Sequence, residues 1–445
     1  MFERVGRLHT CQSPRLKRHW QGVFSLADQA IVSGMSFTTT VLLGRWCGAG
    51  ELGAYALAFT IWIFALNAQM SLISIPYTNQ WRWVPQKDRR AFAGCALLEH
   101  GLLAILGTLL LLAVVVVLRF SGVGNNFARV LPPLALVLPM LLAREFVRRF
   151  AFAHLHMRTA MCLDFAVALF QFSGLVFLRW TGHLSARTAL VALGIGAGAG
   201  SGLMLVVLRR SFSIRWGMLR DSMSKHWRFG RWVFASVSVT VIQGYSIHWC
   251  LAAFQGSLQT GVFAACLAVV QISNPLWLGI GNLLEPRLAK TLAELGLVTL
   301  RRSVVHVTIA LSGLAAIFVV VLVVQGDTLV ELLYNQSEYN GHTHLITVLA
   351  FVVSIGALDG GINHGLRAMD RPDFSFRASV LALIVTLVSG LFLVPHYGIV
   401  GGAYAMLAAE ICGVGTRIGA FFYLTSPRRP RIAAVNPIGE VGGPA

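Results

Sequence analysis

Long apolar runs separated by short polar segments dominate the chain. Leu102–Leu118, Val307–Val324 and Ala378–Val394 each contain no charged residue, and each reaches the roughly 17 residues that the shortest membrane-spanning helix needs. We therefore expect an all-α polytopic membrane protein of about twelve helices. The predicted spans lie near 24–46, 52–76, 93–118, 131–150, 162–180, 188–208, 232–254, 260–284, 304–325, 345–366, 378–395 and 398–424.

The composition agrees with a lipid environment. Of 445 residues, 56% are hydrophobic and only 12% are charged, whereas a soluble domain carries about 25% charged residues. The net charge of +18 comes from short clusters between apolar runs and not from a basic stripe, so we expect no nucleic-acid partner. Most of the seven cysteines lie in apolar segments and read as small hydrophobic residues.

The basic residues also predict an orientation. If the N-terminus is cytosolic, nearly all of the 36 Lys and Arg residues fall on the cytosolic side, including the arginines that close the fourth span, which should snorkel to that face. We therefore expect both termini in the cytosol of a bacterial inner-membrane protein. The exceptions are Arg45, Arg119, Arg129, Arg179 and Arg187 on the outer side and Arg417 within a span.

A weak internal repeat divides the chain into two halves at an offset of 208 residues. Leu43, Gly48, Gly53 and Ala56 match Leu251, Gly256, Gly261 and Ala264. Each half starts on the same side and has an even number of spans, which predicts two parallel, pseudo-symmetric six-helix bundles suited to rocking against each other. The expected parts are a basic cytosolic N-terminus (1–23), a first bundle (24–208), a cytosolic linker (209–231), a second bundle (232–424) and a disordered cytosolic tail (425–445).

Polar residues inside spans mark the candidate substrate cavity, because a polar group facing hydrocarbon is costly. At 100° per residue, the polar residues of the first span fall within an arc of about 140°. We interpret this stripe as facing a wet cavity, although Ser and Thr also serve as contacts between helices. The stripe consists of Asp28, Gln29, Ser33, Ser36, Thr39 and Thr40.

The seventh span, at the equivalent place in the second half, carries Ser236, Thr240 and Gln243 on one face. His248 lies beside that face and could titrate, or could simply be a packing residue. Arg45, at the outer end of the first span, could bind an anion or snorkel to lipid head groups.

Two further charged groups lie in the second half. Glu410 and Arg417 share one face of the last span, where Arg417 could bind an anion and Glu410 a cation. Asp359 and Asn363 share a face of the tenth span. The alternative for both groups is a structural pair satisfied by neighbouring helices.

No catalytic, nucleotide or metal motif accompanies these residues. There is no P-loop, GxSxG or HExxH sequence. His154 with His156, and His342 with His344, lack a Cys or carboxylate cluster at ligand spacing. We expect no enzyme, no cofactor and no metal, and coupling of transport to H⁺ or Na⁺ is the candidate energy source.

Three segments resemble a known family. Asp28-Gln29-Ala30 opens the first span, Glu51-Leu-Gly-Ala-Tyr-Ala-Leu-Ala58 opens the second, and His226-Trp-Arg-Phe-Gly-Arg-Trp232 opens the second half. Together these look like the polysaccharide-repeat flippases of the multidrug/oligosaccharidyl-lipid/polysaccharide (MATE-like) exporter superfamily. The resemblance implies a V-shaped pair of six-helix bundles around a central cavity, and often ion coupling.

The resemblance further implies a substrate and partners. The substrate would be a polyprenyl-diphosphate-linked oligosaccharide passed from the cytosolic to the periplasmic leaflet, for lipopolysaccharide or exopolysaccharide biosynthesis. Polysaccharide polymerase and export proteins are its candidate partners. Arg45 and Arg417 could then meet the diphosphate, and Glu410 a coupling cation. An ion-coupled multidrug exporter of the same fold is the nearest alternative. A membrane polymerase or ligase is a third, with Asp327, Glu331 and Glu338 as its only candidate acids in the longest outer loop.

Overall fold

The fold is known from a computed structural model, which describes residues 14–121, 126–154 and 156–426. Most of the predicted N-terminal segment and nearly all of the predicted tail lie outside these ranges. Within them every regular element is helical. The α-helices are α2 (Pro14–Cys47), α3 (Ala49–Gln69), α4 (Ile75–Trp81), α5 (Arg89–Phe120), α6 (Asn126–Ala153), α7 (Met157–Trp180), α8 (Ala186–Leu208), α9 (Trp216–Phe254), α10 (Gly256–Val270), α11 (Asn274–Tyr334), α12 (Thr343–Ala368) and α13 (Pro372–Leu424).

Short elements join or interrupt these helices. A π-helical turn, η2 (Met70–Ser74), links α3 to α4 without breaking the span, and 3₁₀ turns form η3 (Arg209–Ser211), η4 (Gln271–Ser273) and η5 (Ser337–Tyr339). α11 and α13 each bend at one glycine with positive φ, Gly296 at +79° and Gly398 at +58°. These bends separate spans that the sequence predicts as distinct, because a residue with a side chain rarely adopts that conformation.

Among the described residues, ten helical stretches are long and apolar enough to cross a membrane, and α2 adds a further helix of 34 residues. The predicted all-α polytopic fold is therefore confirmed. Many large apolar side chains point outwards, such as Leu110 at 67% and Val117 at 61% exposure. In a soluble protein such a surface would drive aggregation, so these side chains mark the faces turned to lipid.

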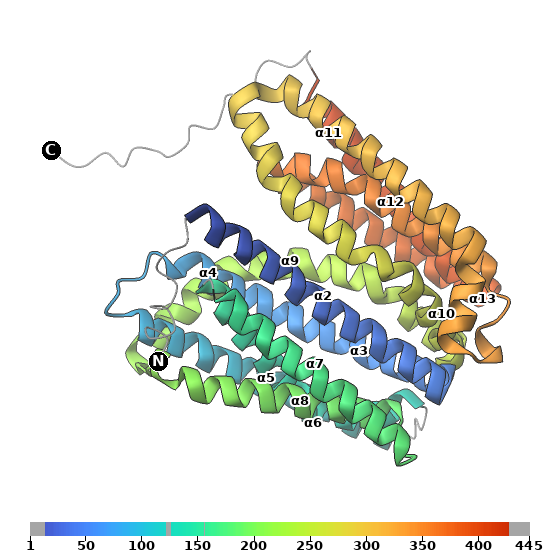
Figure 1. Cartoon of the computed structure of the whole chain (residues 1–445), viewed down its shortest axis with the longest axis horizontal. Helices are drawn as coiled ribbons and strands as arrows, with labels where there is room; N and C mark the ends of the chain where they lie inside the picture. Colours follow the sequence, from blue (N-terminus) through green and yellow to red (C-terminus); the bar gives the residue numbers. More distant parts are fainter. Residues whose placement is uncertain (1–13, 122–125, 155, 427–445) are drawn as a thin grey trace.

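The helices form two groups that meet at one end of the molecule and diverge at the other (Figure 1). α11, α12 and α13 make up one group, while α2 to α8 make up the other. α9 and α10 (Gly256–Val270) pack against both, because α9 contacts α13 as well as α3, α5 and η2, and α10 contacts α12 as well as α3. The groups diverge towards the end where α4 and the beginning of the described chain lie, which is the predicted cytosolic side.

The closed end is built from the predicted repeat. Gly48 and Gly256, which are equivalent in the repeat, both have positive φ, +85° and +81°, and start α3 and α10. Gly53 packs against the backbone of Ser257, and Gly261 packs against the backbone of Ala49. At the offset of 208 residues, Gly261 is equivalent to Gly53, and Ser257 is equivalent to Ala49. The two contacts are therefore equivalent, and α3 and α10 meet about a pseudo-two-fold axis.

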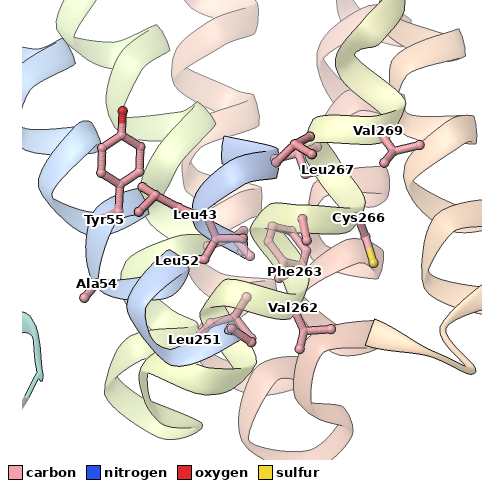
Figure 2. Packing of buried hydrophobic residues seen from close by; sticks show 14 of the residues in the cluster. Leu43, Leu52, Ala54, Tyr55, Leu251, Val262, Phe263, Cys266, Leu267 and Val269 are labelled. Atoms are coloured by element: carbon pink, nitrogen blue, oxygen red, sulfur yellow. The ribbon is translucent and has the colours of Figure 1, made fainter. Parts of the chain in front are cut away.

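Apolar side chains of α2, α3 and α10 fill the space around this contact. Leu43, Leu52 and Tyr55 from α2 and α3 lie beside Phe263 and Leu267 from α10 (Figure 2), and all are buried. Within a membrane these side chains would otherwise face lipid, so close van der Waals packing between them, and not their removal from water, favours the contact. The cluster therefore holds the outer ends of the two groups together.

Candidate functional site

A cavity of about 530 Å³ lies between the two groups on the cytosolic side of the glycine contact. α2, α3, α9, α10, η4 and the start of α11 all contribute to its walls. Its lining combines hydroxyl and amide side chains, such as Ser33 and Gln271, with aromatic rings, such as Tyr55 and Tyr245. None of its lining residues is Asp, Glu, Lys or Arg. The cavity is therefore polar in places but carries no formal charge from these side chains.

The polar stripe of the first span divides between two environments. Ser33, Ser36 and Thr40 line the central cavity. Asp28 is fully buried and Thr39 nearly so, and both face neighbouring helices of the first bundle, where Thr39 accepts a 2.8 Å hydrogen bond from the Gln171 amide. Ser33, Ser36 and Thr40 thus face the cavity, while Asp28 and Thr39 form contacts between helices.

The partner of Asp28 is Arg148 of α6, which donates to it at 2.5 Å. The same guanidinium lies 2.7 Å from Asp164 of α7, and Arg144 approaches Asp164 at 2.6 Å. The expectation that the arginines closing the fourth span snorkel to the membrane surface is wrong for Arg144 and Arg148, whose side chains are 13% and 8% exposed. They are held inside because leaving the two carboxylates without partners would cost several kcal/mol.

A second cavity, of about 230 Å³, lies within the first bundle beside this charge network. Gln29 of the first-span stripe lines it and donates a 3.2 Å hydrogen bond to Ser33. Arg149 also lines it and pairs with Glu145 at 2.6 Å. The six ionised groups of the network, three acids and three arginines, balance to zero charge.

The candidate residues of α9 occupy three positions. Ser236 and Thr240 are exposed on the half of the helix near the open end. Gln243 is half-buried, and its side chain lies near Glu410 of α13. His248 is buried, lines the central cavity and contacts Phe263 edge-on at 5.4 Å.

The charged candidates of the second bundle form one cluster between α12 and α13. Arg417 donates to Asp359 at 2.7 Å and to Ser379 at 3.1 Å. Glu410 lies close enough to both charges to be affected by them, and Gln243 of α9 lies near it. The cluster thus contains two carboxylates and one guanidinium, which leaves one negative charge when both acids are ionised.

Asn363 and Arg45 form hydrogen bonds with residues outside this cluster. Asn363 accepts a 2.8 Å hydrogen bond from Ser375, one turn below Asp359 on α12. Arg45 donates to the Leu332 carbonyl at 3.3 Å, and its own carbonyl accepts from Gln336 at 2.8 Å. Arg45 therefore ties the outer end of α2 to the end of α11.

Sequence reasoning missed the aromatic part of the cavity. Tyr55, Phe59 and Tyr245 line it, but aromatic residues within apolar spans carry no signal of their own. Gln271 and Asn274 also line it and could have been found, because two amides three residues apart inside a predicted span are unusual.

The acids proposed for the polymerase alternative have structural partners. α11 continues to Tyr334, so the outer loop is shorter than the sequence predicts. Glu338 accepts a 2.9 Å hydrogen bond from the Ala49 amide at the start of α3, and Asp327 accepts one from Thr343. Glu338 thus satisfies an amide at the start of α3 that lacks an intrahelical partner, while Asp327 binds the hydroxyl group of the first residue of α12.

Comparison with known proteins establishes the fold. Neither a protein-family model nor a curated protein sequence matches the chain. Among solved structures, the chain is similar to an inward-facing multidrug resistance MATE family transporter of the MOP superfamily (TM-score 0.73, 13% identity, 89% of this chain and 93% of that chain). It is also similar to the lipid II flippase MurJ in an inward closed conformation (0.66, 14%, 91% and 90%) and to the Vibrio cholerae MATE transporter VcmN (0.62, 16%, 92% and 96%).

These structures share one fold over almost the whole length of the chain. The MATE-like architecture implied by the sequence resemblance is therefore confirmed, together with its place among multi-pass membrane transporter folds. At 13–16% identity, the similarity establishes the fold but does not identify the substrate.

Proposed function

We propose that this protein is a transporter that flips lipid-linked oligosaccharide from the cytosolic to the periplasmic leaflet of a bacterial inner membrane, without covalent chemistry. The observation that carries the proposal is the cavity between two groups of helices, sealed at the outer end by the Gly53 and Gly261 contacts and open towards the other end. A cavity sealed at one end only is what alternating access requires.

The lining of the cavity suits uncharged sugars. Hydroxyl groups of Ser33, Ser36 and Thr40 and amides of Gln271 and Asn274 offer donors and acceptors to sugar hydroxyls. Each polar group of a sugar left without a partner in an apolar site costs about 1–3 kcal/mol, so this lining lowers the barrier to crossing. Aromatic rings such as that of Tyr55 present flat apolar faces on which the C–H faces of sugar rings can pack.

The Asp359, Glu410 and Arg417 cluster is the candidate coupling site. Two carboxylates facing one guanidinium carry a residual negative charge, which H⁺ or Na⁺ could neutralise. Gln243 joins this cluster to α9, which contacts both groups of helices. Neutralisation of Glu410 would weaken that link, and so bias the relative position of the groups.

The test is transport by the purified protein in proteoliposomes that contain a fluorescent polyprenyl-diphosphate-linked oligosaccharide with a neutral glycan. We expect the protein to expose the glycan to an enzyme added outside, and Ser36→Phe, which fills part of the cavity, to abolish this. Leu110→Phe is the matched control, because Leu110 is 67% exposed on a face turned to lipid.

The same vesicles distinguish the proposed flippase from the multidrug exporter alternative. The aromatic lining also suits flat apolar drugs, although the cavity lacks a carboxylate to attract a cationic one. Dye transport that Ser36→Phe abolishes, in vesicles that never flip the oligosaccharide, would replace the flippase by this alternative. If flipping occurs, polysaccharide polymerase and export proteins become the expected partners in the cell.

A further inference from the structure

A third cavity, a hollow of about 610 Å³, opens between the end of α4 and the beginning of α9, on the predicted cytosolic side. Lys225 and Arg228 of α9 line it together with Trp83 and Phe229. Asp88 also lines it, but Asp88 is paired with Arg215 at 2.8 Å. Within the part of the chain that the structure describes, neither Lys225 nor Arg228 has an ion-pair partner. The hollow therefore carries two uncompensated positive charges beside aromatic rings.

The shape of this hollow is fixed by the way α9 is held. Ser222, His226 and Gly230 lie one turn apart and are buried against the first group of helices. His226 forms a 2.6 Å hydrogen bond with Glu99 of α5, and Gly230 allows the backbone of Ser71 in η2 to approach closely. The half of α9 that carries Lys225 and Arg228 is thus anchored to α5 and η2, and the hollow exists before any ligand binds.

Exposed side chains continue from the hollow along one face of α9, which we call the α9 path. At 100° per residue, six residues from the hollow towards Glu410 fall within an arc of about 80°. The first five are exposed, and the sixth lies near Glu410. The path is formed by Lys225, Phe229, Trp232, Ser236, Thr240 and Gln243.

The chemistry of the two cavities is complementary. Lys and Arg are the side chains that bind phosphate groups, whereas the central cavity has neither. Trp83, which is 82% exposed, has the amphipathic side chain typical of the membrane–water interface, where a lipid-linked head group lies. A substrate with a diphosphate and a neutral glycan needs both kinds of surface.

We propose that the hollow formed by Trp83, Lys225, Arg228 and Phe229 is a loading site that binds the diphosphate of a polyprenyl lipid carrier before the glycan enters the central cavity. The inference rests on the proposed flippase function and assigns one step of it to a separate site. The α9 path then leads from the hollow towards the cluster of Asp359, Glu410 and Arg417.

The experiment measures binding of undecaprenyl diphosphate, without sugar, to the full chain in nanodiscs made of neutral lipid. We expect the double variant Lys225→Gln/Arg228→Gln to bind it at least about tenfold more weakly, since each hydrogen bond to a charged group that is lost weakens binding by that order. Arg210→Gln/Arg220→Gln is the matched control, which removes two exposed arginines on the same cytosolic stretch outside the hollow. The control should bind as the unaltered protein does.

Phosphatidylglycerol, tested in the same nanodiscs, separates this site from general attraction of anionic lipid. Equal loss in both double variants, or loss of phosphatidylglycerol binding in parallel with the diphosphate, would overturn the loading site in favour of non-specific electrostatics. If the unaltered protein flips the oligosaccharide but the Lys225/Arg228 variant binds the carrier normally, the loading site fails and the flippase function stands. If the unaltered protein neither flips nor binds, both fail.

Discussion

The outer seal depends on two glycines, and adding a single methyl group to one of them should open it. A Cβ atom at Gly53 would overlap the carbonyl oxygen of Ser257, so α3 and α10 must separate to accommodate Gly53→Ala. Overpacking of this kind costs about 1–3 kcal/mol. The cost falls only on the conformation that holds these helices in contact.

This cost converts into a change of population. A difference of 1–3 kcal/mol between two conformations corresponds to about a 5- to 150-fold shift in their ratio. If the sealed conformation is favoured by about a hundred to one, the variant moves the equilibrium towards parity. The central cavity should then become accessible from the periplasm for a much larger part of the time.

Labelling of a cysteine in the cavity measures this shift. Thr40→Cys, in a background without the native cysteines, places a thiol on the cavity wall. A membrane-impermeant maleimide added outside intact cells should react at least about fivefold faster when Gly53→Ala is also present, as the lower bound of the population shift requires. Gly101→Ala serves as the control, because an added Cβ there meets nothing within 4 Å.

Two results would refute this reasoning. Unchanged labelling in Gly53→Ala, with normal amounts of folded protein, would show that the glycine contact does not seal the cavity. An equal rise in Gly101→Ala would show that labelling reports a general loosening of the helices and not the opening of one seal.

Three further predictions concern the charged clusters and one the cavity. Arg148→Ala should leave the buried Asp28 without its counter-charge, and Asp164 with Arg144 alone, at a cost of about 3–5 kcal/mol, so the amount of monodisperse protein on size-exclusion chromatography should fall sharply. Arg417→Ala should act in the same way through Asp359, and the double variant with Asp359→Ala should recover folded protein; no recovery would contradict their pairing. Glu410→Gln should preserve the amount of protein but abolish the stimulation of transport by an imposed H⁺ or Na⁺ gradient, and retained stimulation would remove Glu410 from the coupling site. Thr40→Phe should reduce transport to that of protein-free vesicles at normal protein amounts, and normal transport would argue against this cavity as the route.

The fold could be predicted from the sequence because the membrane imposes simple rules on length and charge. Apolar runs and the distribution of Lys and Arg predict the helices, and the repeat predicts two equivalent halves. Gly48 and Gly256 show why this works: both need positive φ, a requirement local to the residue and therefore visible in the sequence.

The division of the first-span stripe could not be predicted, because it depends on partners far away in the chain. Asp28 points away from the cavity because Arg148, 120 residues later, supplies its counter-charge. Likewise Glu410 and Arg417 share a face of one helix, but Arg417 finds its partner in Asp359 on the neighbouring helix. Helical periodicity gives the direction of a side chain and not what it meets there.

The passage of a polar head between the two groups of helices is tested most directly by photo-crosslinking in living cells. Benzoylphenylalanine in place of Phe59 or Tyr245, on the cavity wall, should capture the lipid-linked sugar during transport. The same residue in place of Leu110, on the face turned to lipid, should not. Capture at Leu110 with none at Phe59 and Tyr245 would contradict the account, because it would place the cargo on the outside of the protein.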